Sequence, residues 1–255
     1  MERKPWTREE LILAFNLYLK IPFGKYHRGN NEVIELANLI GRTPSAVAMR
    51  LSNFASVDPY HQKRGIRGLT GGIAQVKPIW DEFSENKEEL IFESEKILAE
   101  IQNSSIETKY KTVLDGIENL EGESKVREVK TRVNQNVFRQ IVIANYNSKC
   151  AITGFSNPTF LIASHIIPWS VDKQNRLNPQ NGILLNNLHD KAFENGFLAI
   201  DKSFQILICS EFLKSKDNFV QNFFSSYHKT KMNLPIRFLP DSTFLEKHLI
   251  EKFLG

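Results

Sequence analysis

The chain lacks the features that define several classes of protein. It contains only two cysteines, Cys150 and Cys209, and no CxxC pair, so neither a disulfide framework nor a thiolate zinc site is expected. No stretch approaches the roughly 18 consecutive apolar residues of a membrane span. The N-terminal sequence MERKPWTREE is too polar for the core of a signal peptide. We therefore expect a cytoplasmic protein without structural zinc, in which any metal is bound by His, Asn, Asp or water.

What is present is an ordinary globular composition with uneven charge. Hydrophobic residues make up 41% of the 255 residues, so the chain can bury a core. Residues 1–80 contain 12 Lys and Arg against 6 Asp and Glu, whereas residues 81–145 contain 9 against 14. Clustered positive charge attracts DNA, because neutralising phosphates releases condensed counterions. The same surplus also fits an ordinary solvated surface.

Helices are predicted throughout the N-terminal region. Thr7 followed by Glu10 is typical of a capping box ahead of an apolar run at helical spacing. Residues 33–40 place apolar side chains on one face until Gly41. A third helix is predicted to begin at Pro44, because proline is favoured at the first helical position.

The segment VIELANLIGRTPSAVAMRLSNF resembles a helix-turn-helix, whose second helix enters the major groove of DNA. With its apolar stripe turned inward, that helix is expected to present Ser45, Met49, Arg50 and Asn53. Arg and Asn suit the edges of guanine and adenine. A basic loop follows at residues 61–72, and its expected phosphate contacts are Lys63, Arg64 and Arg67. A helical hairpin and a solvated turn without DNA contact remain the alternatives.

The middle of the chain is predicted to be an acidic helix and a connector. The helix covers residues 81–100, the polar connector covers 103–125 with a short helix around 110–117, and a longer helix follows at 125–146. The predicted division is therefore a DNA-reading domain at 1–80, an acidic helix with connector at 81–125, and a further domain at 126–255.

From Cys150 onward the chain changes character. FLIASHII is a strand-like run, NGILL is a short apolar strand after a polar loop, and LHDKAFENG reads as a helix that ends at Gly196. Strand, loop, strand and helix is the order of a ββα-metal finger. The predicted fold class is therefore α+β, with a helical N-terminal domain followed by this finger.

The pattern Cys-x-Ile-Thr-Gly, Ala-Ser-His-Ile-Ile-Pro-Trp, Arg-x-Asn-Pro-x-Asn-Gly and Leu-His-Asp-Lys-Ala-Phe resembles the HNH endonuclease family. It is most similar to the branch found in bacterial restriction and defence nucleases, and it covers about residues 134–201. The resemblance implies hydrolysis of phosphodiester bonds in double-stranded DNA. It also implies a divalent metal, with Mg²⁺ expected and Mn²⁺ or other divalent ions as alternatives.

The resemblance assigns a role to each polar residue of the finger. His165, at the end of the first strand, corresponds to the general base. Asn181 corresponds to the central asparagine, which braces the loop or orients the base. His189 corresponds to the residue that binds the divalent ion, with Asp190 as a further ligand or the partner of a ligand. Arg176 corresponds to the arginine that faces the phosphate.

This sequence departs from the family pattern at several places. Ser164 stands where many relatives have an Asp or His metal ligand, and a serine hydroxyl is a poor ligand. Glu194 stands where relatives often have Asp. Because the zinc-binding CxxC pairs of other branches are absent, the finger is expected to be held by packing of Phe155, Leu161, Trp169, Leu184 and Phe193.

Three functions fit these observations. The first is a bacterial restriction nuclease, with modification dependence left open, or an antiphage nuclease. The second is a helix-turn-helix regulator whose finger does not cut DNA. The third is an effector nuclease activated by a partner or ligand, in which residues 1–125 are a sensor. Double-strand cleavage with one site per chain suggests a homodimer. The isolated histidines His228 and His248 are expected to be packing or surface residues.

Overall fold

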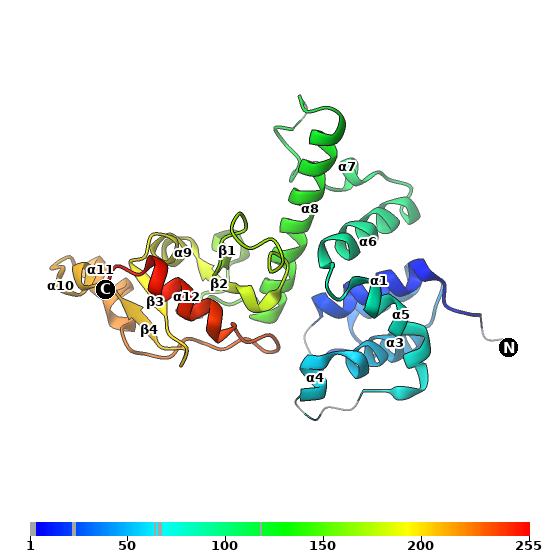
Figure 1. The fold of residues 1–255 in the computed structure, drawn as a ribbon, viewed down its shortest axis with the longest axis horizontal. Helices are drawn as coiled ribbons and strands as arrows, with labels where there is room; N and C mark the ends of the chain where they lie inside the picture. Colours follow the sequence, from blue (N-terminus) through cyan, green and yellow to red (C-terminus); the bar gives the residue numbers. More distant parts are fainter. Residues whose placement is uncertain (1–3, 22–23, 64, 66–67, 118) are drawn as a thin grey trace. The chain divides into compact units, whose positions relative to one another are not determined.

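The computed structural model describes residues 4–21, 24–63, 65, 68–117 and 119–255. Their contacts group into two compact units, Met1–Val137 and Phe138–Gly255. The structure is mainly helical up to Asn145 and then contains two small antiparallel hairpins with helices, which confirms the predicted α+β class (Figure 1). Among the described residues, no helix is both long and apolar enough to cross a membrane.

The first unit is built from short helices. They are α1 (Arg8–Lys20), α2 (Asn31–Leu39), α3 (Pro44–Val57), α4 (Pro59–Lys63), α5 (Ile73–Phe83), α6 (Lys87–Ile101), α7 (Ile106–Lys109) and the beginning of α8 (Gly122–Asn145). The capping box of α1 is present, with Thr7 and Glu10 bonded reciprocally, and α3 begins at Pro44 after the cap Thr43. These local predictions are confirmed, because capping depends only on neighbouring residues.

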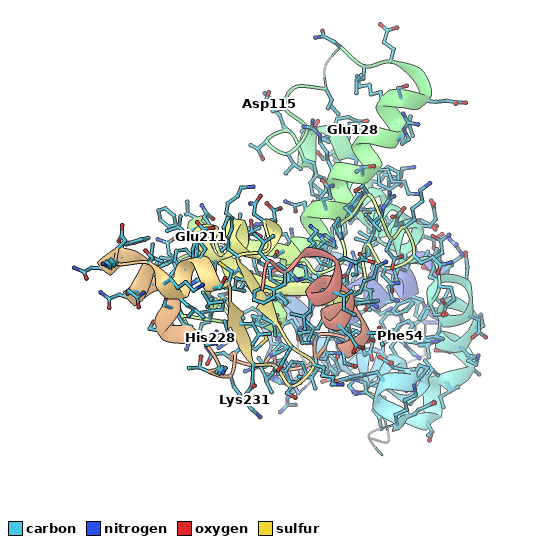
Figure 2. The ribbon with its side chains drawn as sticks, turned by 60° about the vertical axis from the view of Figure 1, so that its left-hand side comes forward. Phe54, Asp115, Glu128, Glu211, His228 and Lys231 are labelled. Carbon is cyan, nitrogen blue, oxygen red and sulfur yellow. The ribbon has the colours of Figure 1, made fainter. Side chains whose placement is uncertain are left out.

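Aromatic side chains join the first helices into one core. The ring of Phe15 in α1 stacks on Phe54 of α3 at 4.7 Å and on Trp80 of α5 at 5.0 Å between centroids. Phe54 is labelled in Figure 2. Since α6 also packs on α1, the acidic segment belongs to this helical unit and does not stand apart from it.

The prediction for the middle of the chain needs correction at two places. The expected helix at 81–100 is two helices, because Asn86 caps a new helix by accepting a hydrogen bond from the Glu89 amide. The expected short helix around 110–117 is absent from the part of that segment that the structure describes, which forms turns. Apolar residues make this segment a packed part of the unit and not a loose connector: Ile106, Tyr110, Leu114 and Ile117 cluster with Phe92, Val129 and Val133.

The second unit contains the hairpin that the sequence predicted. Strand β1 (Leu161–His165) pairs antiparallel with β2 (Gly182–Asn186), and α9 (Asn187–Glu194) packs on both strands (Figure 1). Gly182 lies against α8, and a Cβ added there would be 2.6 Å from Val142 and 2.8 Å from Phe138. This close approach explains the glycine after Asn181.

The rest of the second unit surrounds the finger. Its elements are β3 (Leu198–Ile200), β4 (Ile206–Ile208), α10 (Ser210–Lys214), α11 (Asn218–Phe223) and α12 (Ser242–Lys252). The single-turn helices of the chain are η1 (Thr70–Gly72), η2 (Pro158–Phe160), η3 (Pro179–Asn181) and η4 (Ser225–Tyr227). Helix α12 packs on β3, and the amide of Leu254 donates to the carbonyl of Gly196 at 2.9 Å. The C-terminal segment is thus hydrogen-bonded to the residues that follow α9.

Most of the expected packing residues of the finger are in its core. Leu161 and Leu184 are fully buried, Phe193 is nearly so, and Trp169 is half-buried. Phe155 is wrong as a core residue, because it is 44% exposed and contacts Phe160 at the surface. His228, labelled in Figure 2, accepts a hydrogen bond from the Ile208 amide, and His248 stacks on Phe193 at 3.8 Å. Both histidines are therefore packing residues, as expected.

Candidate active site

The end of β1 places two neighbouring polar residues on opposite faces of the hairpin, because side chains alternate along a strand. Ser164 lies opposite Ile183 of β2, and its side chain is 4% exposed. His165 lies opposite Gly182 and is half-buried. The glycine leaves room at this position, so the imidazole can pack beside α8.

The His165 ring is held in one orientation by three contacts. Its Nε2 lies 2.8 Å from the carbonyl oxygen of Arg176. One ring face stacks on Phe138 at 4.0 Å, and Trp169 meets the ring edge-on at 5.5 Å. A carbonyl oxygen can only accept, so Nε2 must carry the proton and Nδ1 must carry the lone pair. No hydrogen-bond partner of Nδ1 is found within the described chain.

The surroundings of His165 also favour its neutral form. Burial lowers the pKa of the imidazole below its ordinary value, although the hydrogen bond to Arg176 acts in the opposite direction. A neutral ring with an available Nδ1 lone pair can accept a proton near neutral pH.

Asn181 organises the loop that orients His165. Its side chain is fully buried, accepts from the Ile167 amide at 2.8 Å, and donates to the carbonyls of Ile167 and Asn175 at 3.1 Å each. The backbone carbonyl of Asn181 accepts from the Ile166 amide at 2.9 Å. These bonds join the two ends of the loop, so Asn181 sets the position of the Arg176 carbonyl that accepts the hydrogen bond from His165 Nε2–H.

Arg176 contacts the same tryptophan as His165. Its Nε donates to the carbonyl of Trp169 at 2.7 Å, and its guanidinium carbon lies 5.2 Å from the centre of the Trp169 ring. Trp169 therefore contacts both the guanidinium of Arg176 and the ring of His165.

His189 has a different environment from His165. It is fully buried in the first turn of α9, and its Nδ1 lies 2.8 Å from the side-chain amide nitrogen of Asn186. Its Nε2 lies 2.9 Å from the carbonyl oxygen of Phe223, and the two rings stack at 4.7 Å. Both ring nitrogens are thus engaged by protein atoms. The structure does not bring His189 together with His165 in an open site.

A thiol also packs beside His189. Cys150 is fully buried, and its Sγ lies 3.7 Å from the Asn186 amide nitrogen. Burial opposes ionisation of the thiol, but the neighbouring His189 side chain and the hydrogen bonds with Thr153 outweigh it and lower the pKa of Cys150 to about 7. This packing ties the beginning of the finger to α9.

Asp190, the next residue of α9, faces Ser164 of β1. Burial raises the pKa of its carboxyl, while the Ser164 hydroxyl is near enough to lower it in part. No hydrogen bond of normal geometry joins the two. Ser164 Oγ and Asp190 Oδ1 are both buried without a hydrogen-bond partner among the described residues. Two neighbouring buried oxygen atoms without hydrogen-bond partners are uncommon in a folded protein.

These oxygens fit a hard divalent cation better than any other group in the site. Mg²⁺ prefers oxygen ligands and is usually bound by one or two carboxylates together with water and substrate phosphate. The described residues contain no cluster of three or more His, Cys, Asp or Glu that could enclose a metal ion without such additional ligands. Asp190 Oδ1 and Ser164 Oγ could be two of the ligands of the ion. His189 in this arrangement has no available lone pair.

Sequence reasoning missed the residues that decide these orientations. Asn186 caps α9 by accepting from the Leu188 and His189 amides, and its place before an amphipathic helix was a usable signal. The Arg176 and Phe223 carbonyls and the Phe138 ring had no such signal. Backbone carbonyls are present in every residue, and only the fold selects one.

The structure contradicts part of the predicted DNA-reading face of α3. Ser45 and Met49 are exposed, but Asn53 is 5% exposed and donates to the Leu69 carbonyl at 2.5 Å. Arg50 is half-buried, donates to Asn53 Oδ1 at 3.1 Å, and lies 4.8 Å from the ring centre of Trp6. The outward assignment of Asn53 is therefore wrong.

The physical reason is that the following loop folds back over α3. A Cβ added to Gly72 would lie 2.2 Å from Asn53 Oδ1 and 2.7 Å from Arg50 Nη1. The absence of a side chain at this glycine allows its backbone to cover the polar face. Lys63, at the end of α4, is exposed, while Arg64 and Arg67 lie outside the described residues.

The comparison with known families supports the interpretation of the finger. Residues 150–201 match the family model described as HNH endonuclease. No curated protein matches the chain. The matched segment begins at Cys150, includes β1, β2 and α9, and ends directly after β3. The N-terminal helices are not identified as a helix-turn-helix domain. Residues 150–201 are therefore an HNH endonuclease domain.

Proposed function

We propose that this protein is a metal-dependent HNH endonuclease that hydrolyses DNA phosphodiester bonds with His165 as the general base. The observation that carries the proposal is the bond from His165 Nε2–H to the Arg176 carbonyl, because it leaves Nδ1 as an acceptor. The low pKa of the ring keeps that acceptor available at neutral pH.

In this mechanism Nδ1 of His165 takes a proton from water as the water oxygen attacks phosphorus. A new P–O bond forms, the P–O bond to the leaving oxygen breaks, and that oxygen takes a proton from solvent. Asn181 keeps the carbonyl partner of the base in place, and Arg176 supplies positive charge near the phosphate. A divalent cation, Mg²⁺ or Mn²⁺, would neutralise charge on the phosphate when bound.

The biological role that we propose is restriction, with modification dependence left open, or antiphage defence. The support is the likeness of the motif set to that branch of the family. The expected substrate is double-stranded DNA, and cutting both strands with one site per chain leads us to propose a homodimer.

For the N-terminal unit, we favour a sensor or scaffold over base reading by α3. The support is that Arg50 and Asn53 are engaged by Trp6, Leu69 and Gly72. Base readout needs side chains that reach the edges of bases in the groove. Two exposed residues, Ser45 and Met49, are a small surface for that task.

The test is a plasmid cleavage assay with the full chain in Mg²⁺, with and without EDTA. We expect cleavage that EDTA abolishes and that the variant His165→Ala lacks. Cleavage only after addition of a cell extract or small ligand would support the activated effector. DNA binding without cleavage by the wild type under all metals would favour the regulator and contradict the proposal. Sequencing the cut ends would report specificity and strand stagger.

A further inference from the structure

We infer that His189 is a positioning residue for α9 and that the metal ligand supplied by α9 is Asp190, acting with Ser164. This inference rests on the proposed nuclease function. It departs from the role that the family resemblance assigns to His189. Its support is the hydrogen bonding of His189 on one side and the unpartnered oxygens of Asp190 and Ser164 on the other.

The first step is the orientation of the Asn186 side chain. Its Oδ1 accepts from the backbone amides of Leu188 and His189 at 3.1 and 3.0 Å, so this atom must be the oxygen. The other atom, Nδ2, is then a donor, and it lies 2.8 Å from His189 Nδ1. A donor at this distance requires an acceptor, so His189 Nδ1 uses its lone pair on Asn186.

The second step is the other ring nitrogen. Since Nδ1 is the acceptor in a neutral ring, Nε2 carries the proton, and the carbonyl of Phe223 accepts it at 2.9 Å. The ring of Phe223 covers one face of His189 with an interplanar angle of 6°. Phe224 and Tyr227 meet the ring edge-on at 5.2 and 5.8 Å. The neighbouring helix α11 and turn η4 therefore enclose the imidazole.

Metal binding by His189 would disrupt several of these contacts at once. To bind through Nε2, a neutral ring must move its proton to Nδ1, which would face the Asn186 donor. Turning the Asn186 amide would relieve that conflict but would remove both cap bonds of α9. Loss of an N-terminal cap destabilises a helix, so the arrangement resists this change.

Asp190 follows His189 directly in α9. Asp190 is 7% exposed and Ser164 is 4% exposed, yet Asp190 Oδ1 and Ser164 Oγ have no hydrogen-bond partner among the residues described. Buried polar atoms are normally satisfied, and a binding site for an ion is one reason for exceptions. Ser164 directly precedes His165 in β1, so an ion here would be one residue along the strand from the base, although the two side chains leave opposite faces of the hairpin. By holding α9 at Asn186 and Phe223, His189 keeps Asp190 directed toward Ser164.

The first experiment observes the tautomer of His189 directly. The full chain is labelled with ¹⁵N-histidine, and long-range ¹H–¹⁵N spectra are recorded without metal and with Zn²⁺, a cation that imidazole binds readily. The signals are assigned with the variant His189→Gln. We expect His189 to keep its Nε2–H form at saturating Zn²⁺. Loss of the Nε2 proton, or a metal-bound shift of Nε2, would overturn the inference.

The second experiment measures binding of Mn²⁺ by calorimetry, without substrate. Asp190→Asn is expected to weaken binding at least tenfold, and Ser164→Ala by a smaller factor. His189→Gln should bind within threefold of wild type, because the glutamine amide can still donate to the Phe223 carbonyl. Glu211→Gln, an exposed residue of α10 labelled in Figure 2, is the matched control for loss of one negative charge.

Three results would overturn the inference: no Mn²⁺ binding by the wild type, binding unchanged in Asp190→Asn, or His189→Gln weaker than Asp190→Asn. His165→Ala separates this question from the proposed function. It should bind Mn²⁺ like the wild type and cleave DNA about 10² to 10⁴ times more slowly. If wild type binds Mn²⁺ through Asp190 but does not cut, the nuclease proposal fails while the assignment of the ligand holds.

Discussion

The two histidines of the HNH domain lie in different regions, and their hydrogen bonds differ at one ring nitrogen, Nδ1. At the end of β1, His165 donates through Nε2 to a backbone carbonyl and leaves Nδ1 without a partner in the described chain. At the beginning of α9, His189 also donates through Nε2 to a carbonyl, but its Nδ1 accepts from Asn186. The same residue type with the same anchor can therefore act as a base in one place and as a structural bond in the other. What decides is whether a second polar group reaches the remaining nitrogen.

The largest expected effect is the loss of cleavage rate when the proposed general base, His165, is removed. His165→Ala should lower the cleavage rate by about 10² to 10⁴, because that is the usual contribution of a general base. Folding should be nearly unchanged, since the histidine is half-buried. Single-turnover cleavage of plasmid DNA measures the rate, and circular dichroism checks the fold. A rate within threefold of the wild type would refute the mechanism.

The next largest effect is on the free energy of unfolding when His189 is replaced. His189→Ala should lower the free energy of unfolding by about 2–5 kcal/mol, because a fully buried ring is lost and Asn186 and Phe223 lose their partners. Urea denaturation measures this change. His228→Ala, a half-buried ring, is the control and should cost clearly less. Equal losses in the two variants would show that His189 does not anchor α9.

A third histidine gives a pH dependence of stability. Burial lowers the pKa of His248 to about 4, and the bond to the Phe193 carbonyl only partly opposes this. The unfolded chain binds a proton near pH 6.5, so stability is present above that pH and falls as the pH drops toward 4. The loss is at most about 3.5 kcal/mol, at roughly 1.4 kcal/mol per pKa unit. Denaturation between pH 7 and 4 should show a smaller slope for His248→Gln, and an unchanged slope would contradict the assignment.

The same reasoning predicts the pH profile of cleavage. Because burial lowers the pKa of His165, the base stays neutral below the ordinary histidine value of about 6.5. Cleavage at saturating Mg²⁺ should therefore exceed half of its plateau value at pH 6.5, and its midpoint should lie at lower pH. Measuring kcat/KM across this range tests it. A midpoint above 6.5 would mean that the ring is more easily protonated than its burial implies.

The smallest expected effect is in the N-terminal unit, where Arg50 is replaced. Arg50→Ala should lower stability by about 1 kcal/mol, because it removes the hydrogen bond to Asn53 and the contact with Trp6. DNA affinity and base preference should change less than threefold. Lys63→Ala, an exposed variant, serves as the control for stability. Loss of base preference at one position in Arg50→Ala would restore α3 as a reader of DNA.

Local features of the fold were predictable from the sequence, and long-range ones were not. The cap at Thr7, the proline at the beginning of α3, and the order of strands and helix in the finger depend on neighbouring residues or on short periodicity. The break between α5 and α6 was missed, because the acidic and apolar pattern continues across it. The cover of α3 by the loop at Gly72 was also missed, because sequence spacing does not show which distant backbone approaches a helix face.

The sequence by itself determined that residues 150–201 have the order and spacing of an HNH endonuclease domain, because motif residues and strand alternation are written in the chain. Only the tertiary structure decided which groups remain available for chemistry. It assigned the Arg176 carbonyl to His165, Asn186 and the Phe223 carbonyl to His189, and no bonding partner in the described chain to Asp190 Oδ1. Hydrogen bonding capacity is a property of each residue, but its use depends on distances between segments far apart in sequence.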